Sequence, residues 1–113
     1  MEFRQFGSTG LKVSSLGLGL AEIGGLEGDS AVKDAGILLN SALDAGINFL
    51  DTAECYGRSE ELIGQTVSHR RDDYILATKA GHSVAYDPNI DYSSAEPWTA
   101  RTILENIENP AFV

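Results

Sequence analysis

Short apolar runs alternate with amphipathic segments along the chain. Apolar runs with the length of buried strands occur at residues 16–20, 47–51 and 74–78. Each run is followed by a segment whose apolar residues recur at helical spacing, and these segments cover residues 30–45, 59–71 and 97–109. Continuous apolar strands that alternate with helices are typical of parallel βα units, so the pattern predicts an α/β fold.

The first two helices carry recognisable start and stop signals. We expect the first to begin at Ser30, a favoured N-cap residue, and to end before Gly46, which suits the position after a helix. Its core face is predicted to consist of Val32, Ala35, Leu39, Ala42 and Leu43. Ser59 is expected to cap the second helix, followed by acids near its positive end and by core residues, namely Glu60, Glu61, Leu62, Ile63 and Val67.

Turn-forming residues define the elements near both ends of the chain. Residues 3–6 and 11–13 flank a glycine-containing segment and predict a β-hairpin. Pro97 suits the first turn of a third helix, and Pro110 would end it. The apolar stripe of this helix is predicted to be Ala100, Ile103, Leu104 and Ile107.

Composition narrows the classes of partner and compartment. The 113 residues are 42% hydrophobic, enough for a core, and their net charge of −9 disfavours nucleic acid and anionic membranes as partners. The only cysteine, Cys55, excludes an internal disulfide framework and fits a reducing compartment, so we expect a cytoplasmic protein. No apolar stretch follows the first residues as in a signal peptide, and no run approaches the ~20 apolar residues that span a bilayer.

Three residues with complementary chemistry lie just beyond two of the predicted strands. Asp51 ends the second apolar run, Lys79 follows the third, and Tyr56 comes five residues after Asp51. Because neighbouring parallel strands are about 4.8 Å apart, we expect Asp51 and Lys79 to form an ion pair, with Tyr56 above it. A phenol beside an ammonium group and a carboxylate predicts a proton donor. Each residue alone would more often be an ordinary loop, turn or strand-end residue; their joint occurrence favours a site.

The order and spacing of these residues resemble the aldo-keto reductases. The similarity rests on residues 46–53, 56–57, 59–60, 62–64 and 78–79. Residues 6–7, 9–14 and 16–19 are similar to the N-terminal signature of the same family. The resemblance extends to about Asn109 and implies a (β/α)₈ barrel, a fold that typically needs about 250 residues. We therefore expect residues 1–113 to be a single partial domain, with an N-terminal hairpin and about three βα units, truncated before strand four.

A doubly wound open sheet is the alternative architecture. It would bind a dinucleotide through a glycine-rich turn after its first strand. Gly17 and Gly19 are not followed by the remaining glycine of that fingerprint, so the sequence favours the barrel.

The resemblance also implies a reaction and its residues. Aldo-keto reductases reduce aldehydes or ketones with NADPH, and the tyrosine at the position of Tyr56 supplies the proton. Lys79 would stabilise the resulting phenolate, and Asp51 would hold and neutralise a buried Lys79. The implied catalytic residues are therefore Asp51, Tyr56 and Lys79. Leu20, Ala21 and Asp51 are the implied cofactor-binding residues, and no metal is implied.

Other features of the family are missing from this sequence. Its histidine on strand four has no counterpart; His82, three residues after Lys79, does not match that position, and His69 is expected to be solvated. We therefore expect the isolated chain to be inactive, and the full-length parent to act on a small carbonyl substrate. Self-association through open sheet edges and apolar surfaces is also expected, the exposed residues being Leu39, Leu43, Ile103 and Leu104. The alternative is a non-catalytic relative that acts as a binding or regulatory module.

Overall fold

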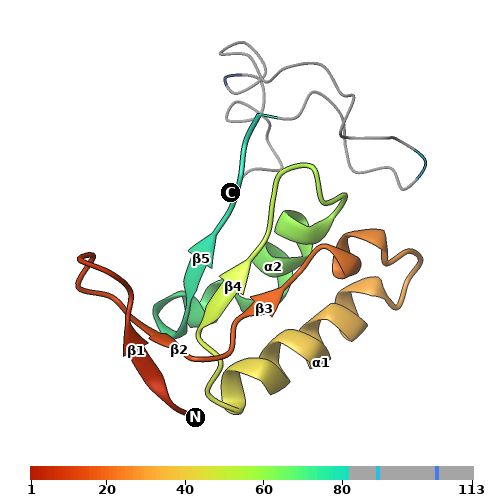
Figure 1. Cartoon of the computed structure of the whole chain (residues 1–113). Coiled ribbons are helices and arrows are strands. Elements are labelled where there is room, and N and C mark those ends of the chain that lie inside the picture. Colours follow the sequence, from red (N-terminus) through yellow and green to blue (C-terminus); the bar gives the residue numbers. More distant parts are fainter. Residues whose placement is uncertain (82–88, 90–103, 105–113) are drawn as a thin grey trace.

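A three-stranded parallel sheet with two helices forms the main body of the molecule. The computed structural model describes residues 1–81, 89 and 104. The strands lie in the order β3 (Leu18–Gly19), β4 (Phe49–Asp51) and β5 (Ile75–Ala77). Helix α1 (Ala31–Asp44) connects β3 to β4, and α2 (Ser59–Val67) leads through the 3₁₀ helix η2 (Ser68–Asp73) to β5. The α/β prediction with parallel strands is therefore confirmed (Figure 1).

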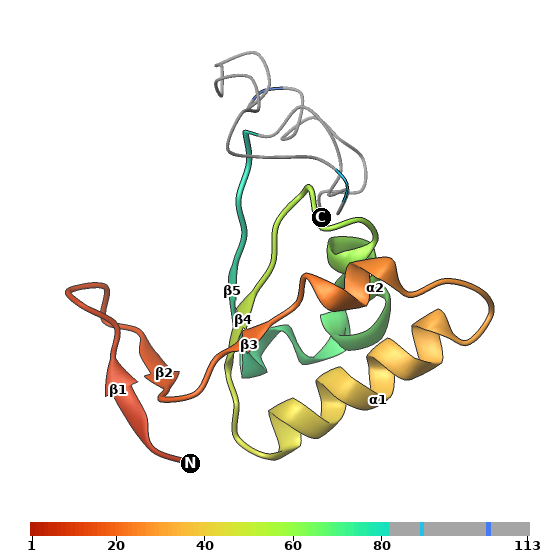
Figure 2. The ribbon, with the colours of Figure 1, turned by 45° about the vertical axis from the view of Figure 1, so that its right-hand side comes forward.

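Both helices cover the same face of the sheet, as the view closer to edge-on shows (Figure 2). The strands are in register at Leu18, Leu50 and Leu76, which point towards the helices and pack in or against the core. The helices contribute Ala31, Ala35, Leu39 and Leu43 from α1 and Leu62, Ile63 and Val67 from α2. Because side chains alternate along a strand, Phe49 and Ile75 face the uncovered side.

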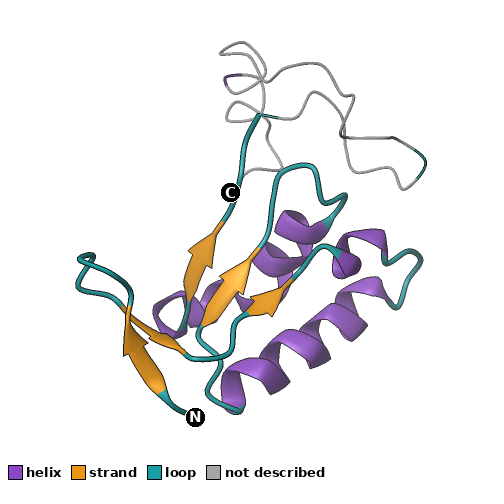
Figure 3. Cartoon of the chain, viewed as in Figure 1, coloured by secondary structure: helices purple, strands orange, loops and turns teal. Residues whose placement is uncertain are grey.

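The predicted hairpin is formed by β1 (Phe3–Gln5) and β2 (Lys12–Ser14), which pair antiparallel. It lies beside the amino-terminal ends of the parallel strands (Figure 3). Asn48 joins it to the sheet: its Oδ1 accepts the Ser14 N–H at 2.7 Å, and its Nδ2 donates to the Lys12 carbonyl at 2.9 Å. Phe6 also packs on Phe49, with ring centroids 5.5 Å apart.

The end of α1 follows the sequence prediction closely. Gly46 has φ +95°, the left-handed conformation that glycine adopts without strain. The Gly46 N–H donates to the Leu43 carbonyl and the Ile47 N–H to the Ala42 carbonyl, both at 3.0 Å. This pair of bonds is a Schellman motif and satisfies carbonyls that the helix itself leaves open.

Three sequence predictions about the helices were wrong. Val32 lies in the first turn, at the end of the core rather than over it, and is 41% exposed, while Ala31 is buried. Leu39 and Leu43 are buried, not exposed, because α1 packs against both the sheet and α2. Ser59 is the first residue of α2 rather than its cap, since its hydroxyl bonds to Thr52; Arg58 holds the cap position.

Other predictions can be checked only in part. Ser30 occupies the N-cap position of α1 as expected, but its side chain makes no capping hydrogen bond. Leu104 is helical and 58% exposed, whereas the rest of the predicted third helix lies outside the described residues. His82 also lies outside them, and His69 is exposed as expected. Within the described part of the chain, no helix is long and apolar enough to cross a membrane.

Candidate functional site

Asp51, Tyr56 and Lys79 meet at the carboxyl ends of β4 and β5. The Lys79 ammonium donates to Asp51 Oδ1 and, at 2.9 Å, to the carbonyl of Thr52. Its Nζ lies 5.1 Å from the centroid of the Tyr56 ring. The predicted ion pair with a phenol beside it is therefore present. The expectation that Lys79 is buried was wrong, because the Lys79 and Asp51 side chains are 46% and 43% exposed.

Backbone hydrogen bonds bring these residues together beyond the ends of the strands. Asp51 pairs with Ala77 in the parallel ladder. The ladder then continues into the loops, where the Thr52 N–H donates to the Ala77 carbonyl at 2.9 Å and the Glu54 N–H to the Lys79 carbonyl at 3.2 Å. Lys79 is thus held by its backbone as well as by its side chain.

The charge of Lys79 is favoured by its surroundings. Partial burial acts to lower the pKa of the ammonium, but the hydrogen bond and charge of Asp51, helped by Tyr56, outweigh that effect. The pKa of Lys79 is therefore raised above its ordinary value. A protonated Lys79 beside the ring can stabilise a phenolate at Tyr56.

Tyr56 lies in a tight turn between β4 and α2. Its N–H donates to the Ala53 carbonyl at 3.1 Å, and its own carbonyl accepts the Ser59 N–H at 3.0 Å. The next residue but one, Arg58, donates its N–H to the Gly24 carbonyl at 3.1 Å. These bonds hold the half-buried tyrosine between α2 and the 3₁₀ helix η1 (Glu22–Gly25), which follows β3.

Two polar contacts around the site were not predicted from sequence. The hydroxyls of Thr52 and Ser59 are 2.7 Å apart and fully buried, which fixes the loop after Asp51 to the start of α2. Glu60 accepts the Thr78 hydroxyl at 2.5 Å. Burial raises the pKa of the Glu60 carboxyl, the bond from Thr78 opposes this, and the charge of Glu54 adds to it. The spacing of Ser59 and Glu60 within the family pattern was the only sequence signal for either contact.

The residues implied in cofactor binding differ in accessibility. The Leu20 side chain is fully buried in the core, and its N–H donates to the Asp51 carbonyl at 2.9 Å, so any ligand contact there comes from its backbone. Ala21 is exposed. Asp51 uses Oδ1 for Lys79, and its Oδ2 has no bonded partner within residues 1–81. A carboxylate oxygen in this position can accept a hydrogen bond from a hydroxyl group of a nucleotide sugar.

Neither the thiol near the site nor a metal-binding cluster adds reactive chemistry to the described part of the site. Cys55, beside Tyr56, is a buried free thiol, and burial raises its pKa, so it stays protonated and packs as an apolar side chain. The described residues contain no group of three histidine, cysteine or carboxylate side chains that could hold a metal ion.

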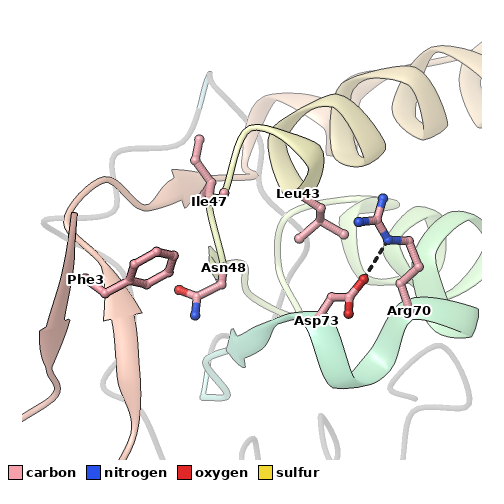
Figure 4. A pocket seen from close by; sticks show the side chains of 7 residues that line it. Phe3, Leu43, Ile47, Asn48, Arg70 and Asp73 are labelled. Atoms are coloured by element: carbon pink, nitrogen blue, oxygen red, sulfur yellow. Dashed lines mark hydrogen bonds and ion pairs between the residues drawn. The ribbon is translucent and has the colours of Figure 1, made fainter. Parts of the chain in front are cut away.

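A separate cavity of about 350 Å³ lies at the opposite end of the sheet (Figure 4). Phe3, Ile47 and Asn48 lie across it from Leu43, Arg70 and Asp73. Arg70 donates to Asp73 and to Asp44, each at 2.8 Å, so the charge of its guanidinium is already balanced. This cavity is remote from Lys79 and does not belong to the same site.

Comparison with known proteins agrees with this geometry. The family model for the aldo/keto reductase family matches residues 15–109. L-galactose dehydrogenase from Arabidopsis thaliana is 37% identical over 96% of this chain and 34% of its own length. A protein from Oryza sativa named as a voltage-gated potassium channel subunit beta is 42% identical over 70% of this chain and 25% of its own length.

The structural comparison gives the same result. PA4992 from Pseudomonas aeruginosa, a protein assigned to the aldo-keto reductases, superposes with a TM-score of 0.69 and 34% identity over 97% of this chain and 42% of its own. The chain thus spans a quarter to a third of the length of the first curated relatives it matches. On both sequence and structure it belongs to the aldo/keto reductase family, and its fold corresponds to the hairpin and first βα units of the family's (β/α)₈ barrel.

Proposed function

We propose that this chain is the N-terminal part of an NADPH-dependent reductase that converts small aldehydes or ketones to alcohols. Membership of the family supports an oxidoreductase. The observation that carries the finer proposal is the position of the Lys79 ammonium between the Asp51 carboxylate and the Tyr56 ring. That arrangement is suited to giving up a phenolic proton and stabilising the anion left behind.

In this proposal each residue has a distinct task. NADPH, when bound, supplies a hydride to the carbonyl carbon of the substrate. Tyr56 donates its phenolic proton to the carbonyl oxygen, so that the substrate leaves as an alcohol and the tyrosine is left as a phenolate. Lys79 stabilises that phenolate, and Asp51 holds Lys79 in place. Asp51 Oδ2, Ala21 and the Leu20 backbone are the groups on this chain that would contact the cofactor.

The isolated 113-residue chain is proposed to be inactive. It matches 42% of the length of the Pseudomonas aeruginosa structure and 34% of that of L-galactose dehydrogenase. The remainder of a barrel would supply most of the walls around a cofactor and a substrate. We also propose a cytoplasmic location, supported by the unpaired Cys55.

The test is Tyr56→Phe in the full-length protein that carries this segment, with NADPH oxidation by small aldehydes as the measurement. Phenylalanine keeps the ring but has no proton to donate, so kcat should fall by about 10²- to 10⁴-fold. Tyr74→Phe is the matched control, since it removes a phenolic hydroxyl just before β5, at the far end of the sheet. Near-normal kcat in Tyr56→Phe would show that Tyr56 is not the acid.

A second candidate is a non-catalytic binding or regulatory module. The identity of 42% to a protein named as a potassium channel subunit beta favours it. The two candidates differ in one measurement. If the unaltered full-length protein folds but neither oxidises NADPH with aldehydes nor binds the cofactor, the reductase proposal fails and the module becomes the better description.

A further inference from the structure

The 3₁₀ helix η1 approaches the Tyr56 turn so closely that a side chain would not fit between them. A Cβ atom built on Gly24 would lie 1.8 Å from the carbonyl oxygen of Tyr56 and 2.6 Å from its carbonyl carbon. Both are backbone atoms, which cannot rotate away as the end of a side chain can. The backbone of η1 therefore packs directly on the backbone of the catalytic candidate.

The neighbouring glycine shows that this restriction is local. A Cβ atom on Gly25 would meet nothing within 4 Å. Neither Gly24 nor Gly25 has a positive φ angle, so both backbones could accept alanine without conformational strain. The two positions belong to the same short helix and differ in whether the Tyr56 turn lies against them.

The core anchors η1 on its own side of this contact, and a backbone hydrogen bond joins it to the other side. On one side, Ile23 is buried in the core at 5% exposure, and the Gly24 N–H donates to the Ala21 carbonyl at 3.2 Å. On the other side, the Gly24 carbonyl accepts the Arg58 N–H at 3.1 Å. A side chain at position 24 would therefore push the Tyr56 turn away from η1, because η1 itself is fixed by the core.

We propose that Gly24 is a positioning residue: by having no side chain, it lets η1 set the position of Tyr56 relative to Lys79. The catalytic part of this inference rests on the proposed role of Tyr56. The same contact connects the loop that carries Ala21, where the cofactor is proposed to lie, with the proton donor. A displacement of the phenol would thus alter its alignment with both Lys79 and the substrate.

The first experiment measures structure rather than activity, in the 113-residue chain. Amide hydrogen exchange is compared between Gly24→Ala and Gly25→Ala. Gly24→Ala should accelerate exchange at Arg58, whose N–H bonds to Gly24, while Gly25→Ala should not. The Ile75 amide, bonded to the Asn48 carbonyl at 2.7 Å at the other end of the sheet, should exchange at the same rate in both variants.

Two exchange results would overturn the proposal. Unchanged exchange at Arg58 in Gly24→Ala would mean that the turn accommodates a methyl group without moving. Faster exchange at both Arg58 and Ile75 would mean that Gly24 supports the fold in general and does not specifically position Tyr56.

The second experiment uses the full-length protein. Misplacement of a reacting group by about 1 Å can cost about 10²-fold in rate, so Gly24→Ala should lower kcat by that order with a smaller change in KM, and Gly25→Ala should stay close to the parent. Undiminished kcat in Gly24→Ala would refute the positioning role. Failure of the proposed function is recognised separately: the unaltered protein would then not oxidise NADPH, or Tyr56→Phe would keep a near-normal kcat, whatever happens at Gly24.

Discussion

Lys79 contacts both of the other residues of the candidate site. Its ammonium donates to the Asp51 carboxylate and to the Thr52 carbonyl, and it lies over the Tyr56 ring. Because the ion pair is more than 40% exposed on both sides, its contribution to stability should be at most about 1 kcal/mol. We therefore expect the interactions of Lys79 to matter mainly for its chemistry.

A prediction follows for Lys79→Met in the full-length protein. Since Asp51 and Tyr56 raise the pKa of Lys79 against the opposing effect of burial, the ammonium stays charged throughout the neutral range. Its removal deprives the phenolate of its neighbouring cation, so kcat should fall by about 10²-fold or more, and the limb of the pH–rate profile that reports the acid should move to higher pH. The measurement is kcat as a function of pH.

The free energy of unfolding should respond to Lys79→Met differently from kcat. A lysine whose pKa is raised on folding contributes stability that is complete below its unfolded pKa of about 10.4 and is lost only as pH rises through the higher folded value. Lys79→Met should therefore change the urea midpoint slightly and equally across the neutral range. Lys33→Met, at an exposed position on α1, is the control and should affect neither measurement. An unaltered pH–rate profile in Lys79→Met would contradict the pairing.

At this scale the sequence predicted the residues with unusual chemistry but not those that position them. Asp51, Tyr56 and Lys79 were predictable because they follow apolar strands at family spacing. The contact of Gly24 with Tyr56 depends on how two loops far apart in the chain approach each other, which no local pattern encodes. The bond between Thr52 and Ser59 likewise forms only once α2 is packed on the sheet.

At the scale of elements, the carboxyl-terminal end of α1 and most of its buried face were predictable, whereas the first turns of α1 and α2 were not. The end of α1 is determined locally, because Gly46 adopts a conformation that other residues avoid. The buried face depends on what lies against the helix: Ala31 is covered and Val32 is 41% exposed, although Val32 has the larger apolar side chain. Spacing alone could not show which residues in the first turn of α1 the core covers.

Two glycine substitutions, one just beyond the end of α1 and one inside it, should have opposite effects. Gly46→Ala forces a side chain into φ +95° and brings its Cβ within 3.0 Å of Met1, so it should destabilise the chain by about 1–2 kcal/mol. Gly36→Ala lies inside the helix, where the new Cβ would make ordinary contact with Thr66 at 3.6 Å, and should stabilise it by about 0.5–1 kcal/mol.

The measurement is the midpoint of thermal or urea unfolding, followed by circular dichroism. Because both variants add one methyl group to the same helix region, a difference in hydrophobicity cannot explain a difference in sign. If Gly46→Ala were neutral, the Schellman motif at the end of α1 would not contribute to stability.

At the scale of the molecule, both edges of the described sheet are unpaired. Within residues 1–81, β3 and β5 each pair with β4 only. Unpaired strand edges can pair with other chains, and contiguous exposed apolar surface favours association. The sequence analysis assigned the exposed surface of α1 to Leu39 and Leu43; the exposed apolar residues of this helix are instead Val32, Ile37 and Leu38.

We therefore predict that the isolated 113-residue chain self-associates. Its apparent mass in light scattering should exceed the 12.1 kDa of a monomer and rise with concentration. If the exposed face of α1 takes part, Leu38→Glu should lower the apparent mass, because it replaces an apolar side chain that is 43% exposed with a charged one.

The control is Ser41→Glu, which adds the same charge at an exposed polar position of the same helix and should have little effect. Equal effects of the two variants would indicate charge repulsion alone, with the open sheet edges as the remaining contact. A monomer at all concentrations, with a sharp unfolding transition, would show that neither the edges nor α1 promote association, and that the short chain is stable by itself.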